Sequence, residues 1–226
     1  MRQTYNIHAY PTHLINSIEL ANGKRITIRP ALPQDAPLEQ QFFERLSHDS
    51  LKDRFNGCAP VAQYSKVDYV TRLGLVATVF EGDVEIVIAQ ASYRLIDEDT
   101  ADFGLAVSEA WRRIGIGTRL VDTLAAAAKG AGARWLIAEA LPGNIAMLAL
   151  MLRCGFTVGE HPADRGLVQL QRRVVAPGVE GRVVHRSGEF LAALRAALPQ
   201  CFEASDVKTG LRLAQASSGT AGPSGR

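Results

Sequence analysis

The sequence predicts an α/β fold in which helices flank a mixed β-sheet. Two stretches carry hairpin signals, one between residues 17 and 28 and one between residues 74 and 95. A third stretch, residues 101–156, holds a strand that leads through a glycine loop into an apolar helix. With 226 residues, of which 47% are hydrophobic, the chain suits one domain with extensions.

The first hairpin is predicted from residues 17–20 and 24–28, which alternate polar and apolar side chains around Asn22-Gly23. Pro30 ends its second strand. A helix is expected to begin near Asp35, because apolar residues then recur at intervals of four. They are Leu38, Phe42 and Leu46.

Further elements follow in order. Residues 47–55 favour a short helical turn, and 57–60 form a break. Strands are expected at 74–80 and 84–95, joined at Glu81-Gly82-Asp83. After the central strand at 102–107, further strands are predicted at 135–141, 156–158 and 167–174.

The glycine loop after residue 107 is typical of a phosphate-binding site. Gly115 and Gly117 allow close approach of the chain, and the first N–H groups of the following helix point at the anion. The apolar face of that helix comprises Leu120, Val121, Leu124 and Ala128. The Rossmann fingerprint is absent because Leu120 occupies the place of its third glycine, and the P-loop is absent because Thr118-Arg119 follows Gly117.

A second motif supports the first. Leu141-Pro142-Gly143-Asn144 leads into a helix whose predicted apolar stripe is Met147, Leu150, Met151 and Cys154, and Gly155-Phe156 ends it. Asn144 suits the N-cap of this helix.

Charge and cysteine content exclude several classes of function. A net charge of +2 gives no indication of nucleic acid or an anionic membrane as partner. The three cysteines, Cys58, Cys154 and Cys201, and the five scattered histidines show no disulfide framework or metal-ligand spacing, so no metal is expected. The first residues lack the apolar segment of a signal peptide, and a cytoplasmic location is the default expectation.

The motif Arg112-x-x-Gly115-x-Gly117, followed by the Asn144 helix that closes in Gly155-Phe156, resembles the GNAT N-acetyltransferases over residues 24–173. The resemblance implies a mostly antiparallel sheet with two splayed central strands and acetyl-CoA bound in the splay. It implies three segments: an irregular lead-in at 1–16, the GNAT domain at 17–175, and an extension at 176–226. The extension is expected to hold one amphipathic helix, begun near Ser187, and a disordered tail.

A narrower resemblance rests on Ala9-Tyr10-Pro11, residues 22–30, Gln34-Asp35 and Arg54-Phe55. These motifs are similar to the GNAT domain of bacterial protein lysine acetyltransferases that act on acyl-CoA synthetases. Two departures are visible: Asp102 stands where those relatives usually have Glu, and Thr71-Arg72 replaces their Arg-Glu pair.

The implied chemistry is direct attack of an amine on acetyl-CoA in a ternary complex. A lysine ammonium must first lose a proton, which costs roughly 4 kcal/mol near neutral pH. A carboxylate can accept that proton. Asp102 is the first candidate and Glu139 the second. The family's usual acid, a Tyr in the last helix, corresponds by spacing to Met151, which cannot donate.

The resemblance assigns the cofactor site to the end of the central strand, the glycine loop and the last helix. These residues are Leu105, Val107, Arg112, Arg113, Gly115, Ile116, Gly117, Thr118 and Asn144. A protein lysine, as in an acyl-CoA synthetase, is the preferred acceptor. A small amine as acceptor and a non-catalytic acyl-CoA-binding module are the alternatives, and the oligomeric state is open.

Overall fold

The computed structural model describes residues 8–20, 23–54 and 67–174. Predictions for Phe55, for the break at 57–60, for Cys58 and Cys201, and for the helix and tail after residue 176 lie outside this part. The division into lead-in, domain and extension stays a prediction. Within the expected lead-in, the structure has one 3-10 turn, η1 (Thr12–Leu14).

The strands form one open sheet in the order β1-β2-β3-β4-β5-β6-β8-β7. Every neighbouring pair is antiparallel except β5 and β6, which are parallel. The expected mixed α/β fold is therefore confirmed. The strands are β1 (Asn16–Glu19), β2 (Arg25–Pro30), β3 (Arg72–Glu81), β4 (Val84–Leu95), β5 (Thr100–Val107), β6 (Trp135–Ala140), β7 (Thr157–Glu160) and β8 (Val168–Arg173).

Both predicted hairpins are present, with small changes in their ends. Strand β3 starts at Arg72, two residues before the predicted start, and β5 starts at Thr100. The pairing of β3 with β4 shifts between Ala77 and Thr78, which leaves Ile88 as the extra residue of a bulge. The carbonyl of Ile88 accepts a hydrogen bond from the N–H of Ser108, 2.9 Å away, where β5 ends.

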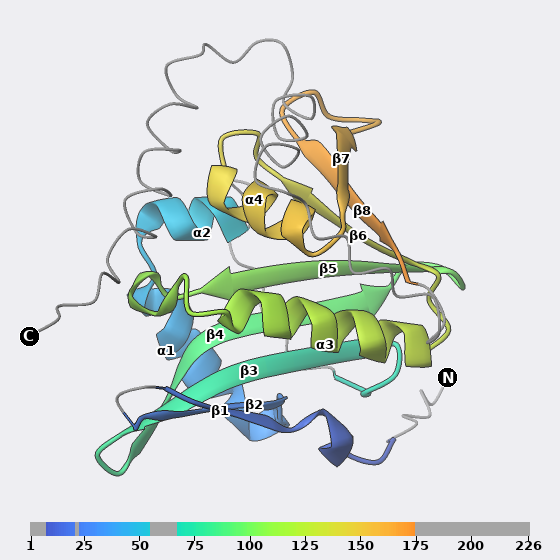
Figure 1. Ribbon diagram of the computed structural model, residues 1–226. Coiled ribbons are helices and arrows are strands. Elements are labelled where there is room, and N and C mark those ends of the chain that lie inside the picture. The colour runs from blue at the N-terminus through green and yellow to red at the C-terminus, as the bar shows by residue number, and fades with distance from the viewer. Residues whose placement is uncertain (1–7, 21–22, 55–66, 175–226) are drawn as a thin grey trace, which may run out of the picture.

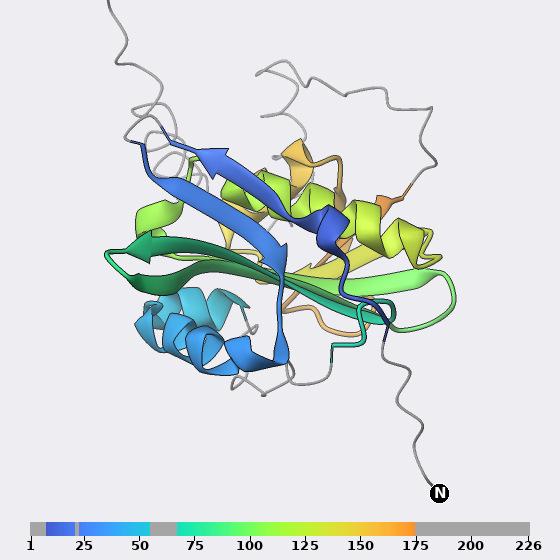
Figure 2. The same ribbon diagram turned by 90° about the horizontal axis from the view of Figure 1, so that it is seen from below.

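Helices cover both faces of the sheet. Helix α3 (Ile116–Gly130) and helix α4 (Ile145–Arg153) pack on one face in the main core, and α1 (Ala36–Arg45) packs on the other around Phe42. Figure 2 shows α1 and α2 (His48–Arg54) across the sheet from α3. Short 3-10 turns, η2 (Pro33–Asp35) and η3 (Glu109–Trp111), complete the described elements.

The buried face of α4 differs from its predicted stripe. Met151 is buried as expected, and so is Cys154 at the C-cap. The other core residues of the helix are Leu148 and Leu152, whereas Met147 and Leu150 are only partly buried. Because apolar residues surround this helix on nearly every side, sequence spacing alone does not select the face that packs.

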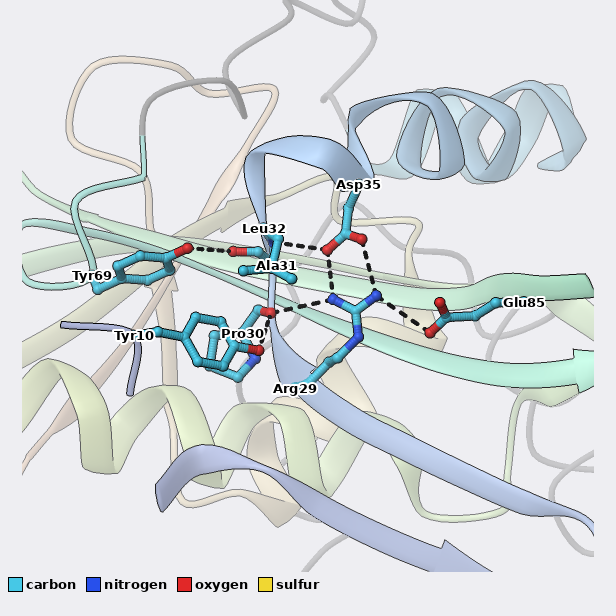
Figure 3. Close-up of polar contacts among 8 residues, drawn as sticks. All are labelled: Tyr10, Arg29, Pro30, Ala31, Leu32, Asp35, Tyr69 and Glu85. Atoms are coloured by element: carbon cyan, nitrogen blue, oxygen red, sulfur yellow. Dashed lines mark hydrogen bonds and ion pairs between the residues drawn. The ribbon is translucent and has the colours of Figure 1, made fainter. Parts of the chain in front are cut away.

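A charged cluster fixes the start of α1 to strand β2 (Figure 3). The Arg29 guanidinium holds Asp35 in two contacts, of 2.5 and 2.9 Å, and reaches Glu85 at 3.3 Å. Asp35 also accepts a hydrogen bond from the Leu32 N–H at 2.7 Å. The hydroxyl of Tyr10 donates to the Pro30 carbonyl at 3.0 Å, so the segment before β1 is attached to the domain.

Strands β5 and β6 separate partway along their length. Only three residue pairs join them, and the last is Asp102 with Ile137. Beyond that pair β5 continues to Val107 beside β4, while β6 continues to Ala140 beside β8. Figure 1 shows the two strands diverging. The splay therefore begins after Asp102, where the β5–β6 ladder ends, five residues before β5 itself ends at Val107.

Candidate functional site

The loop before α3 has two residues in the left-handed region, Arg113 with φ 66° and Gly115 with φ 91°. The helical hydrogen bonds begin with the Arg119 N–H, which donates to the Gly115 carbonyl at 3.2 Å. The N–H groups of Ile116, Gly117 and Thr118 thus precede the first helical bond. Such a helix start, following a loop with alternating backbone conformations, suits an anion.

Arg112 connects this loop to its surroundings through its side chain. Its Nε donates to the Val107 carbonyl at 2.9 Å, and its Nη2 donates to Ser50 Oγ at 2.6 Å. The same Nη2 lies 3.6 Å from a carboxylate oxygen of Glu109. The side chain of Arg112 thus joins the end of β5 to helix α2 and is occupied within the protein.

Glu109 contacts the residues on both sides of this connection. One of its oxygens accepts hydrogen bonds from the Ser47 hydroxyl at 2.7 Å, from the Ser47 N–H at 3.2 Å and from the Ser50 hydroxyl. Partial burial acts to raise the pKa of Glu109, but these hydrogen bonds outweigh it and lower the pKa to about 2. The loop is therefore held to the α1–α2 junction by an ionised carboxylate.

Gly117 lies where α3 comes close to α4. A Cβ at this position would stand 2.9 Å from Cδ2 of Leu150 and 3.7 Å from Cδ2 of Leu105. The next side chain, Thr118, hydrogen-bonds the Cys154 thiol, whose pKa is raised to about 11 by burial. The Thr118 hydroxyl therefore faces α4, and Cys154 is a packed, protonated thiol rather than a nucleophile.

Asn144 caps α4, because its Oδ1 accepts a hydrogen bond from the Met147 N–H at 3.0 Å. Met151 is fully buried in the core. The described tyrosines donate their hydroxyls elsewhere: Tyr10 to the Pro30 carbonyl, Tyr69 to the Ala31 carbonyl and Tyr93 to the Val70 carbonyl. None of these three tyrosines occupies the place of an acid on α4.

Asp102 belongs to the last residue pair before the strands separate. Its Oδ2 accepts a hydrogen bond from Arg94 Nε, 3.2 Å away on the adjacent strand. Burial raises the pKa of Asp102, and the charge of Glu139 adds to the rise, while Arg94 and Arg54 act against it. Arg94 thus supplies the cationic partner that a partly buried carboxylate requires.

Arg54 lies over strand β5 on the same face as Asp102. Its guanidinium occupies the space above Gly104, where an added Cβ would come within 2.3 Å of Nη1. Gly104 follows Asp102 by two residues, so both belong to the same face of β5. A larger residue at position 104 would displace Arg54 from the neighbourhood of the carboxylate.

Glu139 stands on β6 just beyond the separation. Its Oε1 is 3.0 Å from His161 Nε2, and Glu139 is exposed while His161 is largely covered. The structure thus brings together Arg54, Arg94, Asp102, Glu139 and His161. Sequence reasoning assigned no role here to Arg94 or His161 and named Arg54 only within the Arg54-Phe55 motif, because the three residues come from different elements and their meeting is not visible along the chain.

The two halves of the site are joined by the segment of β5 from Asp102 to Val107. Five residue steps of extended chain span about 17 Å. One end has the carboxylates, and the other has the anion-binding helix start. This arrangement suits a long ligand with a phosphate at one end and a reactive group at the other.

Two further features of the described residues concern membranes and metals. No helix among them is long and apolar enough to cross a membrane. Nor do three or more His, Cys, Asp or Glu side chains in the described ranges gather into a possible metal site.

Comparison with known proteins gives a consistent result. The model of the acetyltransferase (GNAT) family matches residues 39–156. An acetyltransferase of Pseudomonas aeruginosa is 26% identical over 159 residues, which cover 67% of this chain and 84% of that protein. Among solved structures, the GNAT domain of PAT from S. lividans is 27% identical with a TM-score of 0.65, covering 73% of this chain and 99% of that chain.

A further structural match concerns the fold alone. The protein yncA from Salmonella typhimurium, solved with its cofactor acetyl-CoA, is 22% identical with a TM-score of 0.52. The match covers 69% of this chain and 99% of that chain.

Proposed function

The chain belongs to the acetyltransferase (GNAT) family, and we propose that it transfers an acetyl group from acetyl-CoA to the amine of a protein lysine. Acetyl-CoA is its cosubstrate, and N-acetyl transfer is its class of reaction. The observation that carries the finer proposal is the position of Asp102, the last residue of β5 that pairs with β6. It lies at one end of the β5 segment whose other end leads into the Arg112–Thr118 loop.

Coenzyme A would be held along this segment. The N–H groups of Ile116, Gly117 and Thr118, presented by the loop that Arg112, Arg113 and Gly115 form, would bind its diphosphate. The backbone of Leu105 and Val107, beyond the β5–β6 ladder, would bind the extended arm, with Asn144 on the facing helix. The side chains of Arg112 and Thr118 already have partners within the protein, so their proposed contribution is through the backbone or through loop order.

Asp102 is proposed as the base. Burial raises its pKa, so it has more affinity for a proton than an ordinary aspartate, which favours a role as proton acceptor. It accepts a proton from the acceptor ammonium, directly or through a water molecule. The freed nitrogen lone pair forms the C–N bond at the thioester carbonyl, the C–S bond breaks, and coenzyme A leaves as the thiolate. The nitrogen then loses its second proton to solvent, which leaves the neutral amide.

The leaving thiolate needs no tyrosine. Met151 is buried and apolar, so α4 supplies no acid at that position. A thiol has an ordinary pKa near 8.5, two units below that of an alkyl ammonium, so the thiolate is a competent leaving group near neutral pH and takes its proton from solvent.

Protein lysine as acceptor rests on two supports. The motifs at residues 9–11, 22–30 and 34–35 resemble protein lysine acetyltransferases, and the structure places Tyr10, Arg29 and Asp35 in the cluster that anchors α1. The match to the GNAT domain of PAT extends over 99% of that chain. An acyl-CoA synthetase is the first partner to test.

The test is incubation of the purified chain with acetyl-CoA and a bacterial lysate depleted of small molecules. We expect release of free coenzyme A together with new acetyl-lysines, detected by mass spectrometry, on a small set of proteins. Asp102→Asn is expected to lower the rate about a hundredfold. No acetyl-lysine in this incubation, together with release of coenzyme A and acetylated small amines in a parallel incubation with a panel of small amines, would overturn the choice of acceptor.

A further inference from the structure

Glu139 shares a face of the sheet with Asp102. In the parallel ladder Asp102 pairs with Ile137, and Glu139 follows Ile137 by two residues. The alternate residues of β6, Leu136, Ala138 and Ala140, are buried in the main core on the opposite face. Asp102 and Glu139 therefore stand on the same side of the sheet, one on each of the two separating strands.

The ring of His161 is fixed by the turn that connects β7 to β8. Its Nδ1 accepts hydrogen bonds from the N–H groups of Asp164 at 2.8 Å and Ala163 at 3.3 Å. Asp164 in turn accepts from the Gly166 N–H at 2.7 Å and, through its carbonyl, from the Leu167 N–H at 3.2 Å. Because a nitrogen that accepts two N–H groups carries no proton, the proton of the neutral ring lies on Nε2.

This tautomer decides the direction of the contact with Glu139. His161 Nε2 donates to Glu139 Oε1 across 3.0 Å. The histidine ring is only 13% exposed, whereas the glutamate is 48% exposed. One oxygen of the carboxylate is therefore held from the protein side, while the group stays accessible to a ligand.

The two carboxylates differ in their partners. Asp102 is paired with the Arg94 cation, and Arg54 lies nearby on the same face. For Glu139, the described part of the chain provides the neutral His161 and no arginine or lysine within ion-pair distance. The Glu139 carboxylate is thus held in one orientation while its negative charge is not neutralised, and such a carboxylate would attract a cation.

We propose that Glu139, held by His161, is the subsite that binds the acceptor's ammonium group, beside the base Asp102. This inference rests on the proposed function. Glu139 binds the cationic form of the amine and brings it to Asp102, which removes the proton. His161 is a positioning residue, since it acts through Glu139 and through the turn.

The experiment uses the full chain loaded with coenzyme A and labelled with ¹⁵N in its histidines. The probe is Nα-acetyl-lysine amide, and Nα-acetyl-norleucine amide is its uncharged counterpart. We expect the lysine probe to shift the His161 ring resonances at millimolar concentration and the norleucine probe to leave them unchanged. Glu139→Gln should weaken lysine binding about tenfold, whereas Glu160→Gln, which removes a neighbouring exposed carboxylate on β7, should not.

A second variant distinguishes the role of His161 in holding the β7–β8 turn from its role in orienting the Glu139 carboxylate. In the His161→Asn variant, the asparagine side chain can still accept hydrogen bonds from the N–H groups of the turn but does not reach Glu139. The thermal stability of this variant should therefore stay near that of the parent. With a peptide substrate that has a free lysine side chain and a blocked N-terminus, this variant and Glu139→Gln should raise KM for the amine about tenfold and change kcat less than threefold.

Three results would overturn the inference: a His161 ring protonated at Nδ1, no shift with the lysine probe, or unchanged lysine affinity in Glu139→Gln. If any of these results occurred while lysine acetylation was normal, the ammonium subsite would be rejected and the proposed function would stand. Loss of acetyl transfer to lysine with intact probe binding would instead count against the choice of acceptor.

Discussion

Arg94 on β4 and Asp102 on β5 face each other across the antiparallel ladder, with Arg94 Nε 3.2 Å from Asp102 Oδ2. This pair occurs at the residue where β5 and β6 stop pairing. The candidate base is therefore paired with a cation while it stands at the start of the strand separation.

Removing the cation should move the pH dependence of catalysis. The positive charge of Arg94 favours the ionised form of Asp102, so Arg94→Gln should raise the pKa of the base. A base acts only when deprotonated, and the acidic limb of the kcat/KM profile should therefore move to higher pH. Arg134→Gln is the matched control, because Arg134 forms a comparable exposed pair with Asp99 at 3.3 Å ahead of β6. An unchanged acidic limb in Arg94→Gln would show that Asp102 is not the base.

Two glycines at opposite ends of α3 allow backbone strain to be separated from ligand binding. Gly115 and Gly132 have φ of 91° and 99°, and neither has an atom within 4 Å of an added Cβ. Alanine at either position should lower the free energy of unfolding by about 1–2 kcal/mol. Only Gly115→Ala should weaken coenzyme A binding, by about tenfold in calorimetry, because Gly115 shapes the helix start. Equal affinity in the two variants would count against the diphosphate site.

Glu109 should stabilise the fold at neutral pH and lose this contribution in acid. Its pKa of about 2 in the folded chain lies below the ordinary value of about 4.3, so the ionised form favours folding. The contribution is complete above the ordinary pKa and is lost as pH falls through 2. Glu109→Gln should lower the thermal midpoint at pH 7, and the difference from the parent should vanish near pH 2. Glu81→Gln, an exposed carboxylate on β3, should show neither effect.

Glu39 should change the pH dependence of stability in the direction opposite to that of Glu109. This residue of α1 is 5% exposed, and one of its oxygens has no hydrogen-bond partner among the described residues. Burial raises its pKa to about 7, with a further rise from Asp35 and a counteracting effect of Arg29. The protonated form favours folding, so stability should decline as pH rises from about 4.3 through 7.

Glutamine mimics that protonated form. Glu39→Gln should raise the free energy of unfolding by roughly 3–4 kcal/mol above pH 8 and leave it unchanged at pH 4. Denaturant titrations at the two pH values give the measurement. Glu44→Gln on the exposed face of α1 is the control. Equal effects at both pH values would place the ionisation of Glu39 outside this range.

The sequence by itself determined the elements of the fold and predicted candidate residues for the site. Asn22-Gly23, Glu81-Gly82-Asp83 and the glycines of the loop are local signals, because turn geometry and helix starts depend on neighbouring residues. Asp102 and Glu139 were also predicted from the sequence as candidate bases, and they stay predictions.

Only the tertiary structure decided what surrounds those carboxylates and where the strands part. Arg94, Arg54 and His161 come from β4, α2 and the β7–β8 turn, and they reach one face because the sheet order places these elements side by side. The same holds for the separation after Asp102 and for the buried face of α4. Contacts between residues far apart in the chain depend on strand register and on the packing of helices, and neither is encoded in local spacing.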